Sequence, residues 1–283
     1  MKKIGWIGFG NMGKPMARNL FNRGHMLKVY RRQNHGVAAE TEARFTFTDS
    51  LAELTNAVDY IFLMLPDDTV CTEIVGKLIK TGLDGKIIVN MSTISVATAQ
   101  YLAQTISDAG SVYIEAPVSG SVKPAEAGNL VILAAGPEKE VLDLQPLFDI
   151  LGNKTIYLGA IGQAAQAKIG INYYMSVLLS GLADTLVFME NKGIDNKKML
   201  EVINAGACAS SLSQIKGTAI LEEDYSAAFP LKYMVKDLHL AKDLGLNSAL
   251  SAVQLQAYAA ANTCYAEEDL IAIHKYFRQK QHR

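Results

Sequence analysis

Short apolar runs alternate with amphipathic segments along the first half of the chain. The strand-length runs are Lys3–Ile7, Met26–Tyr30, Tyr60–Leu65, Ile87–Met91, Val112–Ile114, Leu130–Ala134 and Thr155–Leu158. Segments with helical periodicity lie between several of them, at Lys14–Asn22, Thr69–Ile79, Val96–Ser107 and Glu138–Ile150. This alternation predicts an α/β unit with a doubly wound, mostly parallel sheet covered by helices on both faces. The connection at 118–129 has no helical pattern, so the later strands need not all be parallel.

The pattern changes after Gly162, where strand signals stop. Residues Gln163–Lys192 predict one helix of about thirty residues that ends at Gly193, because glycine commonly follows a helix. The segments after it are helical in pattern. We therefore expect two domains, residues 1–160 with the sheet and an all-α domain at 161–283. The apolar stretch Ile169–Phe188 contains Asn172 and Asp184, which favours a buried core helix over a membrane span.

A glycine-rich turn joins the first apolar run to the first helix. Its sequence is Gly8-Phe9-Gly10-Asn11-Met12-Gly13, and a second strand-like run follows the helix. In this order, G-x-G-x-x-G indicates a dinucleotide site. Gly8 would permit the turn, Gly10 would let the backbone approach a pyrophosphate at the helix N-terminus, and Gly13 would allow close helix–strand packing. The expected fold of the first domain is therefore Rossmann-like.

The end of the second strand indicates which dinucleotide binds. An NAD site usually has Asp or Glu there, which accepts a hydrogen bond from the ribose 2′-hydroxyl. This chain has Arg31-Arg32-Gln33 instead. Two guanidinium groups would attract a 2′-phosphate, which favours NADP(H) over NAD(H). The alternative is that both arginines are simply solvated at the strand end.

Composition limits the other classes of function. The chain has 283 residues, with 27 basic and 28 acidic side chains and a net charge of −1, so we expect no general affinity for nucleic acid or an anionic membrane. The three cysteines, Cys71, Cys208 and Cys264, have no metal-ligand spacing, and we expect no metal site and no disulfide framework. The N-terminus lacks a signal-peptide apolar region before the glycine turn. A reducing cytoplasm is the expected compartment.

Lys168 is the best candidate for a proton donor. It lies among small residues near the start of the predicted long helix, and Asn172 shares its helix face one turn later. A lysine is cationic at its reference pKa of about 10.4, so it could stabilise a developing alkoxide and then protonate it. The alternative is a surface lysine near a helix start.

Three strand ends carry further candidates. Ser119, with the backbone amides around Gly120 and Ser121, could bind a carboxylate, although the segment Glu115–Ser121 could also be an ordinary Pro/Gly/Ser turn. Asn90-Met91-Ser92-Thr93 and Met64-Leu65-Pro66 also end predicted strands. Beside the glycine turn they are candidates for lining the nicotinamide and its ribose.

These motifs together resemble the β-hydroxyacid dehydrogenase family along nearly the whole chain. Ile4–Leu20 resembles its cofactor signature, Asn90–Ser95 and Glu115–Ser121 its substrate loops, Gly162–Asn172 its catalytic helix and Phe229–Asp243 its C-terminal motif. The resemblance implies Lys168 as the catalytic lysine. It implies substrate contacts by Thr93, Ser119, Gly120, Ser121, Asn172, Phe229 and Asp237. It implies cofactor contacts by Gly8, Phe9, Gly10, Asn11, Met12, Gly13, Arg31, Arg32, Met64, Leu65, Pro66, Val70, Thr93 and Lys236.

Within the family, residues Glu115–Gly136 look most like the glyoxylate/succinic semialdehyde reductase branch. Many NADP-using members have Asn-Arg-Thr where this chain has Arg31-Arg32-Gln33, so which arginine binds the phosphate stays open. Tyr173 and Tyr174 replace smaller residues common after the family's asparagine, which leaves the pocket size open.

The resulting expectation is a cytoplasmic, NADPH-dependent reductase of small aldehyde acids such as succinic semialdehyde and glyoxylate, with Lys168 as proton donor. The resemblance also implies a homo-oligomer, a dimer or a tetramer. The first alternative is a 3-hydroxyisobutyrate or tartronate semialdehyde-type dehydrogenase. An imine reductase would have a different residue at position 168. A non-enzymatic NADP-sensing module is the remaining alternative, against which an intact Lys168 and Asn172 argue.

Overall fold

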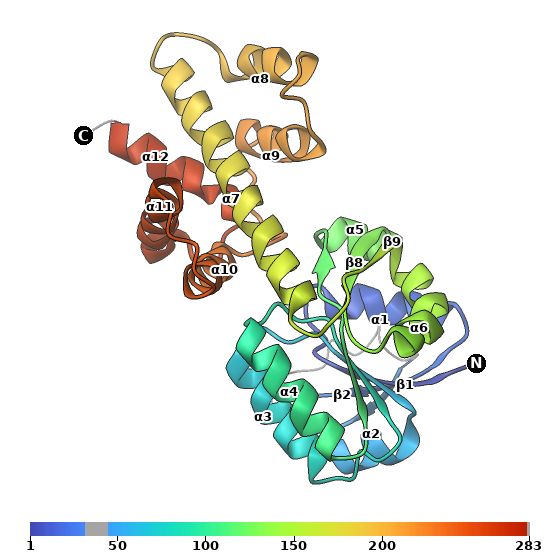
Figure 1. Cartoon of the computed structure of the whole chain (residues 1–283). Coiled ribbons are helices and arrows are strands. Elements are labelled where there is room, and N and C mark those ends of the chain that lie inside the picture. The colour runs from blue at the N-terminus through green and yellow to red at the C-terminus, as the bar shows by residue number, and fades with distance from the viewer. Residues whose placement is uncertain (32–44, 282–283) are drawn as a thin grey trace. The chain divides into compact units, whose positions relative to one another are not determined.

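The computed structural model describes residues 1–31 and 45–281 of the chain. It consists of two compact units, Met1–Lys168 and Ile169–Arg283 (Figure 1). The first unit is α/β and the second is helical, and each is described by itself below. The division lies inside one long helix, which belongs to both.

A six-stranded sheet forms the centre of the first unit. Its strands, β1 (Lys3–Ile7), β2 (Met26–Tyr30), β3 (Thr46–Thr48), β4 (Tyr60–Leu63), β5 (Ile87–Asn90) and β6 (Val112–Glu115), lie in the order β3-β2-β1-β4-β5-β6. Every neighbouring pair is parallel. This is the doubly wound nucleotide-binding order, so the predicted fold class is confirmed. The strand order reverses at β1 and β4, which makes the carboxyl ends of these strands the expected ligand crevice.

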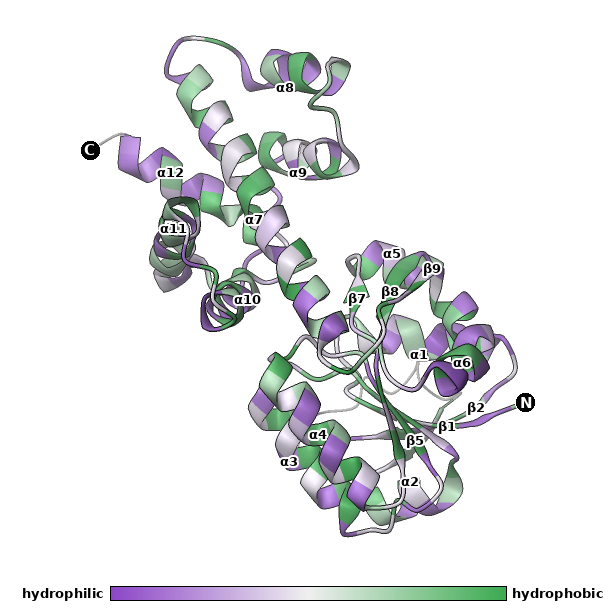
Figure 2. Ribbon diagram, in the orientation of Figure 1, coloured by the Kyte–Doolittle hydropathy of each residue, from purple (hydrophilic) through white to green (hydrophobic). Residues whose placement is uncertain are grey.

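Helices cover both faces of this sheet, as Figure 1 shows for α1 (Gly13–Asn22), α3 (Asp68–Ile79), α4 (Val96–Asp108) and α6 (Glu138–Leu151). Successive strand residues point to opposite faces and so enter different cores. Phe62 packs in the core that contains residues of α1 and α6. Its neighbours Ile61 and Leu63 pack in the core that contains residues of α3 and α4. This double burial explains why β1, β4 and β5 are nearly continuous apolar runs, and much of the sheet is green in Figure 2.

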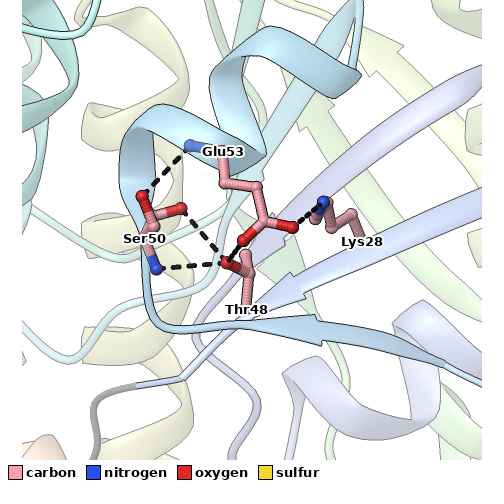
Figure 3. A network of polar contacts seen from close by, with 4 residues as sticks. All are labelled: Lys28, Thr48, Ser50 and Glu53. Atoms are coloured by element: carbon pink, nitrogen blue, oxygen red, sulfur yellow. Dashed lines mark hydrogen bonds and ion pairs between the residues drawn. The ribbon is translucent and has the colours of Figure 1, made fainter.

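Two elements after the second strand were not predicted, β3 and α2 (Leu51–Ala57). A polar network joins them to β2 (Figure 3). Glu53 accepts hydrogen bonds from Lys28 and Thr48, and Ser50 caps α2 by accepting from the Glu53 amide. The Ser50-x-x-Glu53 spacing is a helix-start signal that the sequence carries. Strand β3 is short and only partly buried, so it has no apolar run by which it could be recognised.

The later strands form a separate small sheet. Its order is β7 (Val118–Ser119), β8 (Leu130–Ala134) and β9 (Gly152–Tyr157), and the short helix α5 (Val122–Ala127) joins β7 to β8. Strands β7 and β8 are antiparallel, whereas β8 and β9 are parallel. The expectation that the later strands need not all be parallel is therefore confirmed, although the connection at 118–129, where the sequence shows no helical pattern, contains α5.

The second unit is helical throughout its described residues. Its helices are α7 (Gln163–Glu190), which starts in the first unit, α8 (Asn196–Ala205), α9 (Ser211–Leu221), α10 (Leu231–Asp243), α11 (Ala249–Tyr265) and α12 (Ile273–Gln281). A short 3₁₀ turn, Leu270–Ala272, precedes α12. Leu179 and Leu186 of α7 are fully buried in the core of this unit. By length and composition alone α7 could span a membrane, but the core helix of a soluble protein passes the same test.

Candidate active site

The glycine turn has the geometry that its sequence predicts. Gly8 has a φ of 100°, and a Cβ there would lie 2.1 Å from the carbonyl oxygen of Met64. A Cβ on Gly13 would lie 1.9 Å from the carbonyl oxygen of Gly8, which shows how closely α1 packs on the turn. A Cβ on Gly10 would meet nothing within 4 Å among the described atoms. Gly8 and Gly13 therefore shape the turn, and Gly10 leaves open space above it.

The start of α1 suits an anion. Met12 precedes its first residue, and no side chain among the described residues caps the helix. The first turn contains no acidic residue. A helix N-terminus with uncapped amides favours a phosphate group. Phe9 is half-buried and Asn11 exposed, on the turn before the helix. The described residues therefore fit a dinucleotide pyrophosphate at this position.

Arg31 lies directly after β2, where a 2′-phosphate would be recognised. Its guanidinium carbon lies 4.0 Å from the ring centre of Phe47 and 5.1 Å from that of Phe9. The Arg31 amide also donates to the carbonyl oxygen of Thr48. The two rings form an aromatic support for the guanidinium that the sequence did not predict, because Phe47 belongs to the overlooked strand β3. Arg32, the other predicted phosphate ligand, lies outside the described residues.

A chain of hydrogen bonds joins the carboxyl ends of β4 and β5 to a side chain of β6. The Leu65 amide donates to Ser92 Oγ at 2.8 Å, and the Ser92 amide donates to Asn90 Oδ1 at 3.0 Å. Asn90 Nδ2 donates to the hydroxyl of Tyr113, at 3.1 Å. Burial raises the pKa of Tyr113 well above its ordinary value, so this phenol stays neutral and can accept the bond.

This network fixes the segments from which the predicted nicotinamide contacts come. Met64 and Leu65 are half-buried and Pro66 is exposed, directly after β4. Thr93, half-buried, follows Ser92. Val70, in the first turn of α3, donates its amide to Asp67 Oδ1. The sequence predicted these residues as cofactor contacts. It did not predict that Ser92 links the segment after β4 to the segment after β5 by accepting from the Leu65 amide.

Lys168 is buried, with 8% of its surface exposed, near the start of α7. The beginning of this helix is held by Glu115, at the end of β6. Glu115 Oε2 accepts from the Gly162 amide at 2.8 Å, and Oε1 accepts from the Ala165 amide at 2.7 Å. Burial raises the pKa of Glu115, although the amides it accepts from act in the opposite direction. The interpretation of Lys168 as a surface lysine is therefore wrong.

The predicted substrate loop follows Glu115 along the chain. Ser119 ends β7, Gly120 has a φ of 130°, and Ser121 precedes the first residue of α5. A Cβ on Gly120 would lie 2.8 Å from Leu130 Cδ2, so this position requires glycine for space as well as conformation. Glu115 therefore links the start of α7, whose amides it accepts from, to the loop that follows it in the chain.

A second polar group lies in the helical unit. Asn172 Nδ2 donates to Asp237 Oδ2 at 2.5 Å, and both side chains are almost fully buried. Asp237 Oδ1 lies 3.2 Å from Lys236 Nζ. The structure therefore joins three of the predicted residues, and Asp237 orients the carboxamide of Asn172.

Phe229 is held by a residue that sequence reasoning missed. Asp269 Oδ2 accepts from the amides of Ala228 and Phe229, both at 3.1 Å, and Asp269 Oδ1 accepts from Lys216 Nζ at 2.7 Å. Asp269 is 1% exposed. No motif pointed to it, because its partners lie about forty residues earlier in the chain.

Comparison with known proteins agrees with this geometry. Residues 3–159 match the family model described as the NAD binding domain of 6-phosphogluconate dehydrogenase. Residues 162–277 match the model described as NAD-binding of NADP-dependent 3-hydroxyisobutyrate dehydrogenase. Both descriptions indicate an oxidoreductase that uses a nicotinamide cofactor.

Individual relatives cover nearly the whole chain. Glyoxylate/succinic semialdehyde reductase 1 of Arabidopsis thaliana is 32% identical over 93% of this chain and 91% of its own length. Mitochondrial 3-hydroxyisobutyrate dehydrogenase of Mus musculus is 29% identical over 98% of this chain and 88% of its own. The solved structure of 3-hydroxyisobutyrate dehydrogenase from Mycobacterium tuberculosis with L-serine is 26% identical, has a TM-score of 0.86, and matches over 98% of this chain and 99% of its own.

Proposed function

Because the chain belongs to the β-hydroxyacid dehydrogenase family, we propose that it is an NADPH-dependent reductase of small aldehyde acids such as succinic semialdehyde and glyoxylate. Support for the substrate class comes from the Arabidopsis relative, which is named for these two compounds. Support for NADPH comes from Arg31, whose guanidinium is held on two aromatic rings where an acid would stand in an NAD site.

The chain's own residues hold the cofactor in this proposal. The turn at Gly8–Gly13 and the start of α1 bind the pyrophosphate, and Arg31 and Arg32 bind the 2′-phosphate. Residues Met64–Pro66, Val70, Thr93 and Lys236 line the rest of its site. The nicotinamide, when bound, supplies the hydride for reduction of the carbonyl group.

Lys168 Nζ donates a hydrogen bond to the substrate carbonyl oxygen, stabilises the negative charge that develops there, and then protonates it. Asn172, four residues later on α7, donates its amide to the same substrate, and Asp237 fixes the orientation of that amide. Ser119 and the backbone at Gly120 and Ser121 bind the substrate carboxylate. Phe229 supplies an apolar contact.

One observation carries this proposal: Lys168 is 8% exposed yet lies on a helix whose start is pinned by a buried carboxylate. A surface lysine would be solvated and would need no such support. The same observation argues against a binding module without chemistry, because such a module has no use for a buried, positioned amine.

A 3-hydroxyisobutyrate or tartronate semialdehyde-type dehydrogenase is the second candidate. It is favoured by the mouse relative and by the 2-hydroxy-3-oxopropionate reductase of Escherichia coli, which is 30% identical over 93% of this chain. The same residues would then serve oxidation, with Lys168 as proton acceptor. A cytoplasmic location and a dimer or tetramer remain part of the proposal.

NADPH consumption at 340 nm with a panel of substrates tests the proposal. The panel pairs succinic semialdehyde and glyoxylate with uncharged aldehydes of equal length, and the reverse assay uses 3-hydroxyisobutyrate with NADP⁺. We expect the highest kcat/KM for an aldehyde acid with NADPH. Faster turnover of 3-hydroxyisobutyrate would favour the second candidate. NADPH binding without turnover of any carbonyl acid would favour the binding module.

A further inference from the structure

The start of α7 lacks a capping residue of its own. The residues before its first turn are Leu158-Gly159-Ala160-Ile161-Gly162, none of which has a side-chain oxygen. The first amides of a helix have no partner within the helix and need an outside acceptor when buried. Gly162 and Ala165 are both buried. The helix that carries Lys168 therefore depends on a group from elsewhere in the fold.

Glu115 supplies that group across 47 and 50 residues of sequence. In a capping box, two local side chains satisfy the amides of the residue before the helix and of its third residue. Here one carboxylate accepts both bonds, from Gly162 and from Ala165. A glutamate on a strand thus takes the place of two capping side chains on the helix.

The backbone of Glu115 is itself fixed on two sides. It pairs with Asn90 of β5 in the parallel sheet, and it exchanges two backbone hydrogen bonds with Ala135, at 2.8 and 2.9 Å. Its side chain, 2% exposed, therefore has little freedom. A carboxylate kept in a buried place against its preference for water is typical of functional positions.

Glu115 lies between two parts of the proposed active site. Four residues after it comes Ser119 of the substrate loop, and three residues after its partner Ala165 comes Lys168. Three residues of α-helix rise about 4.5 Å, so the amine and the cap belong to adjacent turns. Any shift of the first turn of α7 would therefore move Lys168 relative to the loop.

We propose that Glu115 is a positioning residue, which acts as a remote cap of α7 and thereby sets the place of Lys168 relative to the Ser119–Ser121 loop. This inference rests on the proposed role of Lys168. It assigns Glu115 no contact with substrate or cofactor. The expected signature is a loss of kcat with little change in KM or in NADPH affinity.

The test compares Glu115→Ala, Glu115→Asp and Glu115→Gln with the wild-type chain. Asp195 gives a matched control, because it caps α8 through the amides of Lys197 and Lys198 and lies outside the proposed site. Hydrogen exchange of the peptide that covers 160–168 measures the cap directly. Steady-state kinetics on the best aldehyde acid and NADPH titration measure its consequence.

We expect faster exchange at 160–168 in Glu115→Ala, and a fall in kcat of about 10- to 100-fold, since misplacement of a catalytic group by about an ångström has effects of this size. KM and the NADPH Kd should change less than about threefold. Glu115→Asp keeps the charge but shortens the reach, and should retain more activity than Glu115→Ala. Glu115→Gln keeps the shape of the side chain and one acceptor oxygen. It therefore replaces Glu115→Ala in both measurements if the alanine variant does not fold. Asp195→Ala should leave kcat and exchange at 160–168 unchanged.

Unchanged exchange at 160–168 in both Glu115→Ala and Glu115→Gln would overturn the cap. Faster exchange with wild-type kcat would overturn the positioning role. A wild-type chain that reduces no carbonyl acid would contradict the proposed function instead, and the exchange measurement would still decide whether Glu115 caps α7.

Discussion

The nucleotide-binding unit and the helical unit hold the groups of the proposed site in different ways. In the first, Ser92 and Glu115 accept hydrogen bonds from backbone amides of other elements. In the second, Asp269 also accepts from the backbone amide of Phe229, but Asn172, Asp237 and Lys236 hold one another through their side chains. The first arrangement is fixed by sheet register, whereas the second depends on which helix faces pack together.

The difference has an energetic consequence. Replacement of an accepting side chain in the first unit leaves the backbone amide in place as a buried donor without its acceptor, at a cost of about 1–3 kcal/mol. In the second unit, a variant can remove one side chain of the group, and Asp237 keeps Lys236 as a partner when Asn172 is replaced. We therefore expect variants at backbone-anchored positions of the first unit to act on stability and activity together, and those of the second unit to separate the two.

The largest effects are expected in the glycine turn of the first unit, where one glycine should affect cofactor binding and the other stability. Gly10→Ala should leave stability unchanged, because its Cβ would meet no atom of the described residues within 4 Å, yet weaken NADPH binding on the order of 100-fold by the loss of charge-assisted bonds to the pyrophosphate. Gly8→Ala should instead lower the free energy of unfolding by on the order of 3 kcal/mol, from its positive φ and its contact with Met64. Calorimetric titration and chemical denaturation measure the two. Equal behaviour of both variants would contradict the assignment of separate roles.

The next effect concerns cofactor choice. Replacement of Arg31 and Arg32 by alanine should weaken NADPH binding by about 10- to 150-fold for each arginine that binds the phosphate, since one charge-assisted hydrogen bond contributes about 1.5–3 kcal/mol. The NADH affinity should change less than threefold. Phe47→Leu, which removes the ring under the Arg31 guanidinium, should give part of the loss. Equal weakening of both cofactors would show that these arginines do not recognise the 2′-phosphate.

In the helical unit, His274 should make stability depend on pH. Burial, and to a smaller extent Arg278, lowers the pKa of His274 from 6.5 to about 4, and its Nδ1 lies 3.0 Å from the hydroxyl of Tyr225. The unfolded chain binds the proton more tightly, so stability is lost as pH falls below 6.5 and the loss is complete near 4. Between pH 7 and 5 the loss should be about 2 kcal/mol. Denaturant titrations of wild type and His274→Phe at both pH values test this, and an identical pH dependence would contradict it.

The smallest effect is expected at the substrate loop. Ser119→Ala should raise KM for an aldehyde acid by about tenfold, the size of one lost hydrogen bond to a charged group. An uncharged aldehyde of the same length should be affected by less than a factor of about two. Steady-state kinetics with both substrates provide the comparison. If KM rises equally for both substrates, the loop does not bind the carboxylate.

Sequence pattern predicted the bounds of three strands. Strands β1, β2 and β8 begin and end at the predicted residues. Apolar runs mark β1 and β8, most of whose residues are buried, whereas in β2 only the alternate residues Leu27 and Val29 are buried. The pattern could not show β3, which is short and partly exposed, nor Phe47 as a support for Arg31. Helix α2 carries a readable cap at Ser50 and Glu53 that was overlooked.

The residues of the candidate site also divide into those that the sequence predicts and those that it does not. Lys168, Asn172 and the glycine turn follow from local motifs and from the resemblance to a family. Glu115 and Asp269 could not be predicted as anchors, because each binds amides that lie 40 to 50 residues away in the chain. Such long-range bonds depend on tertiary packing, which periodicity in one segment does not contain.

Steady-state reduction of an aldehyde acid by Lys168→Ala tests the central claim most directly. We predict that the variant binds NADPH and unfolds like the wild type, but that its kcat falls by about 10²- to 10⁴-fold, the range for a lost general acid. Lys168→Arg should recover little, because a guanidinium does not give up its proton. A folded Lys168→Ala protein with nearly wild-type kcat on its best substrate would contradict the account.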